Sequence, residues 1–483
     1  MFTTTILTVL FSVTPDSYLD IVYPEYVFTP PLAQEYEEVV LENIPVFIAE
    51  DTALPLISVT ATFRGGGYLI PNENTGAVSM MASLLRSGGT TTMTAEEVDE
   101  AFAFLAATSD VSGGGTTVTA TLNSLSSNFE KSFDLFLNML QNPAFQASRV
   151  SLEKDSALEG MKQRNDESSA VLRRENTTML FGDSYMGRNI TQETLESIGV
   201  DILRSTHQSI VNPTNLVLSI SGDFDKENML AYLSTKLHGW SPGSLSSSPP
   251  DVASSYVPGV YYIHQDVPQG GVRICIRTLR LGDPDVEAAE VMNYILGGGG
   301  FSSRITQTVR SDEGLAYSAG SQFSPGVWSD GLWAAGYESK SETVALAAKL
   351  VFDEINRIKT ELISDEDLAL AKNATIEQFP SMFKSKSDTL GVFVSDYLTN
   401  RDSSYWETYR KKIKGVTKED VRRVANKILK PEEMFVLVVG NWDKIKVGDA
   451  DGRANMNDIK EIIGGDITEL PLRDPLTLEI KNQ

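Results

Sequence analysis

The sequence predicts an α+β protein of two homologous domains, and three observations support this prediction. Strand and helix patterns come in mixed blocks, which is typical of mostly antiparallel sheets with helices packed on one side and not of a doubly wound parallel sheet. The same order of blocks then occurs twice along the chain. The 483 residues exceed what a single hydrophobic core normally organises. We therefore expect one sheet with its helices in each half.

Each half begins with an alternating strand that leads into an apolar helix ending in glycines. In the first half, Leu56–Gly67 (LISVTATFRGGG) precedes Gly76–Gly89 (GAVSMMASLLRSGG). In the second half, Gly271–Gly282 (GVRICIRTLRLG) precedes Glu287–Gly300 (EAAEVMNYILGGGG). Alternation of apolar residues predicts the strands, and apolar residues spaced three and four apart predict the helices.

The remaining elements of each half also correspond. Each half closes with a β-rich segment that runs into Gly, a polar residue, an aromatic residue and Asp: NLVLSISGDFD, ending at Asp225, and MFVLVVGNWD, ending at Asp443. Long helical patterns lie between these landmarks, at Ala95–Ala107, Leu125–Leu140, Ser148–Phe181, Ser341–Leu362 and Asp365–Thr399. Further strand patterns lie at Gly114–Leu122 and Ala316–Ser324.

A segment rich in Ser, Pro and Gly at 241–258 is the clearest linker. It predicts a first domain over 36–240 and a second over 259–446, with tails at 1–35 and 447–483. The N-terminal tail has an apolar run at Ile6–Val13, but no Lys or Arg precedes it and no small-residue cleavage site follows. A weak export signal, with a bacterial periplasmic location, and a simple tail on a cytoplasmic protein both stay open.

Composition excludes several classes of function. The net charge of −24 disfavours binding to nucleic acid and anionic lipid, and no apolar run is long enough for a membrane span. The single cysteine, Cys275, excludes an intrachain disulfide and a multi-cysteine zinc site, and its alternating strand predicts a buried structural thiol. The three histidines, His207, His238 and His264, are scattered, so they form no two-histidine zinc helix.

Other motifs fail on spacing. Gly297–Arg304 (GGGGFSSR) lacks the Gly-Lys-Ser/Thr ending of a phosphate loop and the last glycine of a dinucleotide fingerprint. No G-x-S-x-G elbow is present. The acidic stretch Asp449–Asp458 lacks the spacing and terminal Glu of an EF-hand.

The duplicated halves and the segment Leu296–Ser321 (LGGGGFSSRITQTVRSDEGLAYSAGS) resemble one family, the pitrilysin and insulinase zinc peptidases. The short bacterial members, akin to mitochondrial processing peptidase, are the most similar in outline. The resemblance runs from about Glu38 to Asp443, and Leu296–Ser321 matches the family's second-domain signature. It implies two domains that form half of a clamshell around a peptide chamber.

The first half departs from the family pattern where the metal is held. Active members carry H-x-x-E-H, in which two histidines bind zinc and the glutamate is the general base for the zinc-bound water. The matching positions are Ser79, Ala82 and Ser83, and the family's distal glutamate falls on Glu159. Serine hydroxyls and an alanine methyl do not supply this chemistry. We therefore expect no zinc in this chain, and Glu159 reverts to a polar residue on an amphipathic helix.

The second-domain signature is kept. Arg310 lies near the end of a helical pattern that Gly314 breaks, and Tyr317 starts the next strand, so both side chains are expected on one side of a cleft. In the family, the matching Arg and Tyr hold the scissile peptide and its developing oxyanion, a role that a permanent cation and a phenol suit. A cap on the helix C-terminus and a tyrosine packed under the glycine loop are the structural alternatives.

Some bacterial relatives are heterodimers in which one subunit carries zinc and the other supplies the Arg and Tyr. The resemblance therefore implies a non-catalytic subunit whose partner is a homologous H-x-x-E-H chain and whose substrates are unfolded peptides. If the carboxylates line the chamber, basic peptides are favoured. The main alternative is a structural or peptide-binding protein that keeps the fold without proteolysis. A hydrolase using Ser79 or Ser83 is the weakest alternative, because no base or oxyanion motif accompanies either serine.

Overall fold

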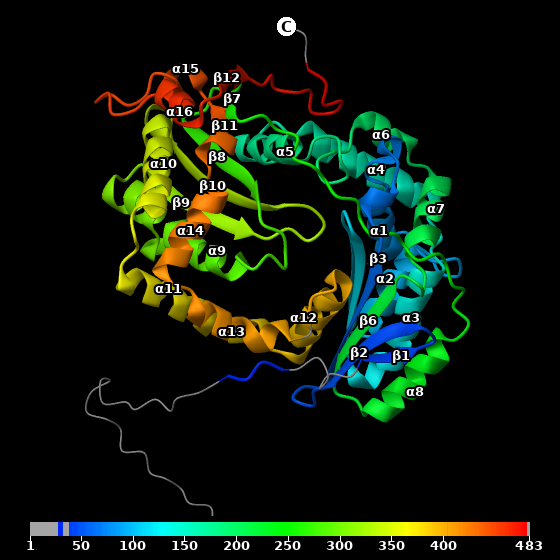
Figure 1. Ribbon diagram of the computed structural model, residues 1–483. Coiled ribbons are helices and arrows are strands. Elements are labelled where there is room, and N and C mark those ends of the chain that lie inside the picture. The colour runs from blue at the N-terminus through cyan, green and yellow to red at the C-terminus, as the bar shows by residue number, and fades with distance from the viewer. Residues whose placement is uncertain (1–27, 32–37, 403, 481–483) are drawn as a thin grey trace, which may run out of the picture.

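The computed structural model describes residues 28–31, 38–402 and 404–480, so the predicted apolar run at Ile6–Val13 lies outside the described residues. Two six-stranded sheets organise the chain and stand on opposite sides of the molecule in Figure 1. Both sheets are mostly antiparallel and carry helices, which confirms the predicted fold class. Among the described residues, no helix combines the length and the apolar character that crossing a membrane requires.

The first sheet belongs to the first half of the chain. Its strand order is β1-β2-β6-β3-β5-β4, and among the described strands of this sheet only β2 and β6 pair in parallel. The strands are β1 (Glu38–Leu41), β2 (Ile44–Glu50), β3 (Leu56–Arg64), β4 (Thr108–Gly113), β5 (Thr117–Leu125) and β6 (Leu216–Gly222). Alternation along β3 sends Val59, Ala61 and Phe63 into the core and leaves Thr60 and Arg64 on the other face.

The second sheet repeats this arrangement, with the order β12-β7-β11-β8-β10-β9. Its strands are β7 (Gly259–His264), β8 (Gln269–Thr278), β9 (Ala316–Ser324), β10 (Gly331–Lys340), β11 (Phe435–Gly440) and β12 (Asp466–Glu469). Strand β3 pairs antiparallel with β5 and β6, and β8 pairs antiparallel with β10 and β11, so the centres of the two sheets correspond. The predicted C-terminal tail therefore contains a strand of the second sheet.

Helices surround both sheets, and Figure 1 shows most of them outside their own sheet. The first half contains α1 (Ala77–Ser87), α2 (Ala95–Phe104), α3 (Phe129–Gln141), α4 (Ala147–Lys162), α5 (Ser168–Phe181), α6 (Gln192–Ser197), α7 (Val200–Ile210) and α8 (Lys226–Leu237). The second half contains α9 (Val286–Asn293), α10 (Val344–Thr360), α11 (Asp365–Gln378), α12 (Lys386–Thr399), α13 (Tyr405–Gly415), α14 (Lys418–Ile428), α15 (Trp442–Ile445) and α16 (Met456–Ile463).

Two helices cross from one half to the other, which the sequence does not predict. The long pattern Ser148–Phe181 breaks after Lys162, and Asp365–Thr399 breaks at the 3-10 turn Phe379–Phe383, which contains a proline. After these breaks, α5 packs on β8 and β11 of the second sheet, and α12 packs on β2 and β6 of the first. Figure 1 shows α5 and α12 spanning the space between the sheets at opposite ends. Each sheet thus has a helix from the other half on its inner face.

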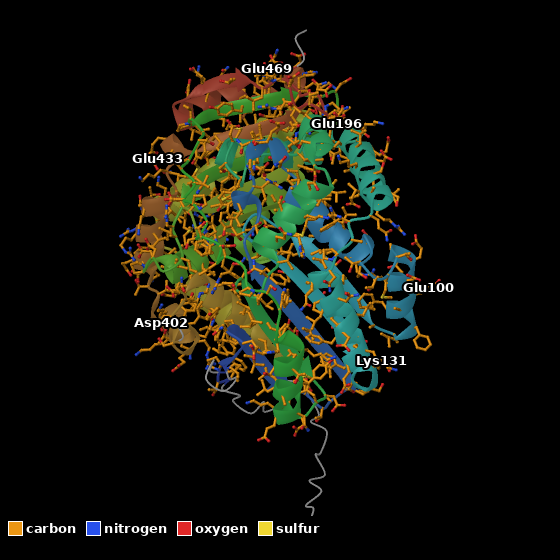
Figure 2. All side chains as sticks on the ribbon, turned by 90° about the vertical axis from the view of Figure 1, so that its right-hand side faces the viewer. Glu100, Lys131, Glu196, Asp402, Glu433 and Glu469 are labelled. Carbon is orange, nitrogen blue, oxygen red and sulfur yellow. The ribbon has the colours of Figure 1, made fainter. Side chains whose placement is uncertain are left out.

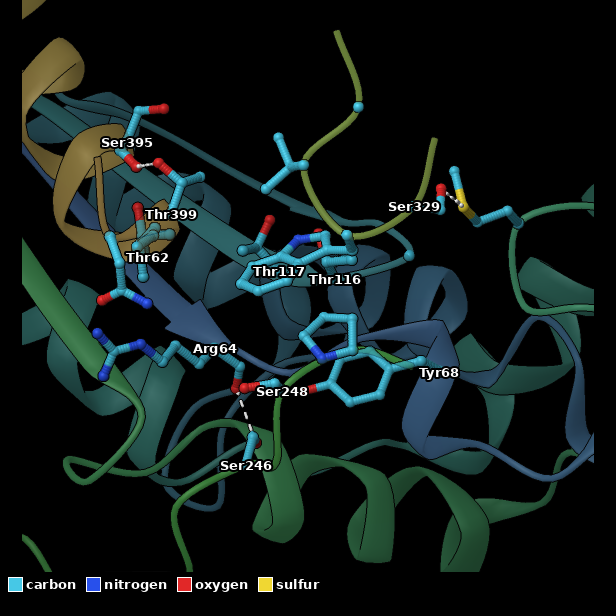
Figure 3. A pocket seen from close by; sticks show the side chains of 18 of the residues that line it. Thr62, Arg64, Tyr68, Thr116, Thr117, Ser246, Ser248, Ser329, Ser395 and Thr399 are labelled. Carbon is cyan, nitrogen blue, oxygen red and sulfur yellow. Dashed lines mark hydrogen bonds between the residues drawn. The ribbon is translucent and has the colours of Figure 1, made fainter. Parts of the chain in front are cut away.

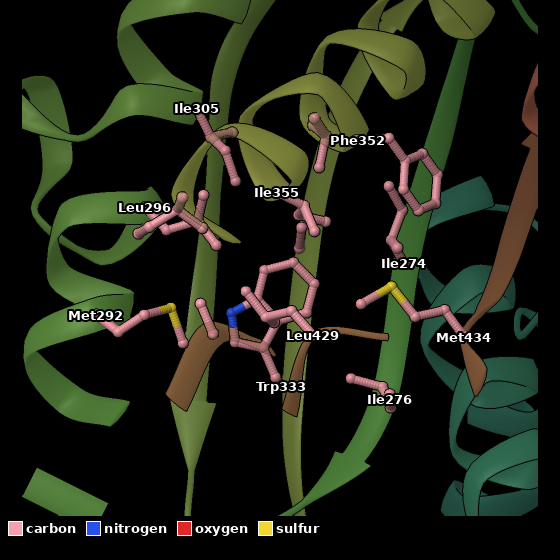
Figure 4. Packing of buried hydrophobic residues seen from close by; sticks show 14 of the residues in the cluster. Ile274, Ile276, Met292, Leu296, Ile305, Trp333, Phe352, Ile355, Leu429 and Met434 are labelled. Carbon is pink, nitrogen blue, oxygen red and sulfur yellow. The ribbon is translucent and has the colours of Figure 1, made fainter. Parts of the chain in front are cut away.

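Each half encloses its own hydrophobic core. In the second core, Trp333 of β10 is fully buried among aliphatic side chains, and Figure 4 shows it near Leu429. Its indole Nε1 donates to Asn293 Oδ1 at 3.0 Å, which satisfies the one polar atom of the ring. Cys275 lies under α5, where its Sγ donates to Asn176 Oδ1 at 3.2 Å. Burial raises the pKa of the Cys275 thiol to about 12, as expected for a structural cysteine.

Candidate functional site

The helix that corresponds to the zinc helix is α1, and its motif positions hold no metal ligand. It starts after Gly76, whose φ of 102° and close approach to Ile190 leave no room for a side chain. Ser79 is exposed, and its hydroxyl donates to Gly76 O at 3.0 Å. Ala82 is only 1% exposed. A Cβ added to Gly113 of β4 would lie 3.1 Å from the Ala82 methyl, so α1 and β4 close over the general-base position.

Glu159, at the position of the distal ligand, is exposed on α4 and pairs with Lys162 at 2.6 Å. The part of the chain that the structure describes contains no cluster of three or more His, Cys, Asp or Glu side chains able to hold a metal. The residues at the motif positions therefore do not fit zinc. Ala82 has no donor atom, and Ser79 and Ser83 offer only neutral hydroxyls. Glu159 is a surface carboxylate in an ion pair. That this chain binds no zinc stays a prediction.

Arg310 and Tyr317 lie together on the second half. Arg310 is in a π-helical turn, η8 (Thr306–Asp312), Gly314 ends this turn with φ of 64°, and Tyr317 is the second residue of β9. The Arg310 guanidinium carbon lies 5.1 Å from the centre of the Tyr317 ring and 4.3 Å from that of Phe301. Tyr317 is 88% exposed and Phe301 67%, so neither ring is packed under the glycine loop. Within the described residues, Arg310 forms no ion pair and no hydrogen bond through its side chain.

Phe301, Arg310 and Tyr317 are called the triad here, and the signature residues around them have structural roles. Ser303 and Thr306 are buried, and their hydroxyls lie 2.9 Å apart. Ser303 Oγ donates to Gly300 O at 2.7 Å, and Thr306 Oγ1 donates to Ala319 O at 2.7 Å, which connects the glycine loop to β9. A Cβ on Gly297 would lie 2.5 Å from Ser321 N, so only glycine allows this close approach. The sequence motif thus fixes where Phe301 and Arg310 stand.

The triad borders a pocket of ≈ 620 Å³ on the second sheet, called the triad pocket here. Phe301, Arg310 and Tyr317 line one side, and Gln269 and Arg273 line another. Arg273 lies flat over Gly336, where a Cβ would come 1.9 Å from its Nη1. The charged and aromatic groups of this pocket are suited to holding a peptide carbonyl and, through Arg310, the negative charge that a carbonyl develops during attack.

A second pocket, of ≈ 1010 Å³, lies between the two halves and is called the central pocket here. Its walls come from the inner face of the first sheet, from α12, from the interdomain linker and from the loop between β9 and β10. Figure 3 shows Thr62, Arg64, Thr117, Ser395 and Thr399 around this space. The structure therefore brings together residues from seven separated stretches of the chain.

Comparison with known proteins shows what these features belong to. Residues 59–194 match the family model described as insulinase (peptidase family M16), and residues 197–375 match the model described as the peptidase M16 inactive domain. The two models follow each other over about two thirds of the chain. The chain belongs to the M16 peptidase family.

Among the individual M16 relatives, one is named a non-peptidase homolog and others are named zinc proteases. The non-peptidase homolog YmxG of Helicobacter pylori is 22% identical over 427 residues, which cover 86% of this chain and 96% of that protein. An uncharacterized zinc protease of Rickettsia bellii is 26% identical over 333 residues, covering 64% of this chain and 77% of its own length. Both matches reach across most of the relative.

Solved structures show the same fold. A peptidase M16 inactive domain from Pseudomonas fluorescens superposes with a TM-score of 0.74 at 21% identity, covering 82% of this chain and 95% of its own. A chain of complex III2 from Candida albicans gives a TM-score of 0.69 at 13% identity, and the match covers 89% of this chain and 99% of that one. The M16 fold is therefore shared by proteins of different names.

Sequence reasoning placed Arg310 and Tyr317 but missed Phe301 and Arg64. Phe301 stands inside the M16 signature, directly after four glycines, and an exposed aromatic residue in a glycine loop was a usable signal. Arg64 ends the alternation of β3 with a charge before three glycines. The one property that sets it apart, its place in the central pocket, depends on α12 and the linker, which lie far away in the sequence.

Proposed function

We propose that this chain is the non-catalytic subunit of a two-chain zinc metallopeptidase, in which it presents Arg310 and Tyr317 to peptides at the zinc site of a homologous H-x-x-E-H subunit. One observation carries the proposal: the Arg310 guanidinium stands between two exposed aromatic rings and has no carboxylate partner among the described residues. The relatives support it, since one is named a non-peptidase homolog and another a zinc protease.

The chemistry follows from the residues of this chain. Arg310 keeps its charge at all physiological pH values, and the flanking rings of Phe301 and Tyr317 restrict its rotation. Its N–H groups donate to the carbonyl oxygen of the scissile peptide, and the hydrogen bonds strengthen as that oxygen becomes negative. The Tyr317 hydroxyl provides a second donor. The partner's zinc, when bound, activates the attacking water.

The substrates would be unfolded peptides. Strand β9 is the edge strand of the second sheet and carries Tyr317 near its start, so an extended peptide can pair with its main chain. Such pairing uses backbone hydrogen bonds and makes few demands on peptide sequence. It also aligns the peptide with the Arg310 side of the triad pocket.

The test is purification of the full chain from its native cells, followed by metal analysis and a peptide hydrolysis assay. The chain alone should hold no stoichiometric zinc and cleave no peptide. A zinc-bearing H-x-x-E-H homologue should co-purify, and the mixture should hydrolyse unfolded peptides. Hydrolysis by the chain alone, or full activity of the homologue without it, would contradict the proposal.

The second candidate is a structural or peptide-binding protein that keeps the fold without proteolysis. The match to a chain of complex III2 favours it, because this fold is present there as well. Recovery of the chain as a homodimer, from cells that encode no H-x-x-E-H homologue, would support this candidate over the first.

A further inference from the structure

The central pocket contains a cation without an ion-pair partner among the described residues, in a chain whose net charge is −24. Among the residues that line it, only Arg64 and Asp330 are charged. Asp330 Oδ1 already accepts from Arg280 Nε at 2.7 Å, and Arg280 also binds Asp251 at 2.7 Å. The Arg64 guanidinium contacts the Tyr397 ring at 4.9 Å and forms no ion pair within the described residues. Arg64 is therefore the one charge in this pocket that lacks a counter-charge.

Asp330 is the one carboxylate among the described residues that line the central pocket. Figure 2 shows Glu100 and Glu196 pointing outward from the helices of the first half, and both are exposed. The inner face of the first sheet bears hydroxyl groups instead, from Thr60, Thr62, Thr117 and Ser219. The wall of the central pocket is thus not acidic, contrary to what a chamber lined by the carboxylates of this chain would require.

The backbone holds Arg64 in place. Its N–H donates to Asn215 O at 2.9 Å, and its carbonyl accepts from Ser246 Oγ at 3.0 Å. The next residue, Gly65, has φ of 117°, and an added Cβ there would lie 2.9 Å from Ser246 Oγ. The end of β3 is therefore fixed against the linker, and Figure 3 shows the Arg64 side chain directed into the pocket, on the side of Thr62. Only the side chain is free to adjust to a ligand.

Neutral donors line the same pocket as this cation. The hydroxyls of Thr60, Thr62, Thr117 and Ser219 have no hydrogen-bond partner among the described residues, although all four residues line the pocket. The Tyr185 hydroxyl, which belongs to another lining residue, is buried without a partner. Burial raises the pKa of Tyr185, so this group stays a neutral donor. An arginine with unpaired hydroxyls matches a carboxylate, which accepts several hydrogen bonds and a bidentate guanidinium.

We infer that the central pocket binds a carboxylate of the peptide substrate through Arg64, and so selects peptides that carry an acidic side chain or a free C-terminus there. This inference rests on the peptide binding in the proposed function. The triad pocket would hold the scissile region, and the central pocket would hold a separate part of the same peptide. Specificity would then come from Arg64, while Arg310 would act on the reacting carbonyl.

Isothermal titration of the full chain with three octapeptides tests this inference. All three are acetylated and consist of Ala, Ser and Val around a variable central residue: Glu with an amidated C-terminus, Gln with an amidated C-terminus, and Gln with a free C-terminus. The Glu peptide should bind roughly tenfold more tightly than the amidated Gln peptide, as one charged hydrogen-bonded contact permits. Tight binding by the free Gln peptide would identify the C-terminus as the ligand group.

Variants of Arg64 test whether this residue causes the preference for the Glu peptide over the amidated Gln peptide. Arg64→Gln should remove the preference without changing the affinity for the amidated Gln peptide, and Arg64→Lys should keep part of it as a point charge. Arg204→Gln, on the exposed surface of α7, removes the same charge far from the pocket and should leave the preference intact. Circular dichroism checks that each variant is folded.

The outcomes separate the two proposals. Equal binding of all three peptides would overturn the inference, and peptide binding would stand. The same holds if the preference for a carboxylate survives in Arg64→Gln, or if that variant weakens the binding of all three peptides equally. Absence of binding by every peptide would overturn both the inference and the peptide binding on which it rests.

Discussion

The two halves of the chain share one sheet topology but differ at corresponding places. In the first half, α1 is sealed against β4, and the general-base position, Ala82, is buried. In the second half, the helix after β8 passes into the π-helical turn Tyr294–Gly298 and then into a glycine loop. This loop displays Phe301 beside Arg310, which stands in the next turn, η8. The two halves therefore share their sheet packing, while the way each helix ends sets which polar groups are exposed.

The close packing of α1 against β4 predicts the largest effect, a loss of folding stability. Ala82→Glu would bury a carboxylate between α1 and β4, where Ala82 is 1% exposed, and should lower the free energy of unfolding by about 3 kcal/mol or more. Ser79→Glu, at the exposed first turn of the same helix, should change it by less than about 0.5 kcal/mol. Urea unfolding followed by circular dichroism measures both. Equal effects would show that α1 is not closed at Ala82.

A pH titration sharpens the comparison, because the first core contains a buried histidine. Burial lowers the pKa of His207 from 6.5, and its Nε2 donates to Leu140 O at 2.7 Å. As pH falls below 6.5, the unfolded chain takes up a proton that the folded chain does not, so stability decreases until the folded pKa is reached. His207→Gln keeps a donor without this titration.

The unfolding midpoint of the wild-type protein should therefore decrease more between pH 7 and pH 5 than that of His207→Gln. The same measurement on a variant of the exposed His238, for instance His238→Gln, is the control and should match the wild type. Parallel losses in the wild type and His207→Gln would contradict the assignment.

The smallest effect concerns the ring beside Arg310. Phe301→Ala removes one of the two rings that hold the guanidinium, and a cation–π contact at an exposed site contributes about 0.5–1 kcal/mol. Peptide turnover by the two-chain complex should decrease by roughly two- to fivefold. Phe104→Ala on α2, at a site that is also highly exposed, should leave turnover unchanged. A loss of stability in place of turnover would make Phe301 a packing residue.

Much of the fold was predictable because it is encoded in local periodicity. The strand expected at Ala316–Ser324 matches β9, and the helix expected in Gly76–Gly89 contains α1. The break between α4 and α5 was not predictable, since residues 163–167 contain neither Gly nor Pro. Nothing local indicates that α5 and α12 cover the opposite sheets, because that choice depends on apolar faces far away in the sequence.

In the candidate site too, some residues were predictable from local sequence and others were not. Arg310 and Tyr317 are seven residues apart and joined by one glycine turn, so local sequence suffices to bring them together. Arg64 gains its significance only from α12, the linker and the loop of the other half. Charge composition does not say where the carboxylates lie, whereas strand alternation places hydroxyls on the inner face of the first sheet.

The most direct test of the central claim compares the two halves in one assay. Peptide turnover is measured for the complex with its zinc-bearing partner, using Arg310→Ala and the double variant Ser79→Ala/Ser83→Ala. We predict a decrease in kcat of about 100-fold for Arg310→Ala, the scale of losing an oxyanion donor, and no change for the double variant. Unchanged turnover in Arg310→Ala, or loss of turnover in the double serine variant, would contradict the account.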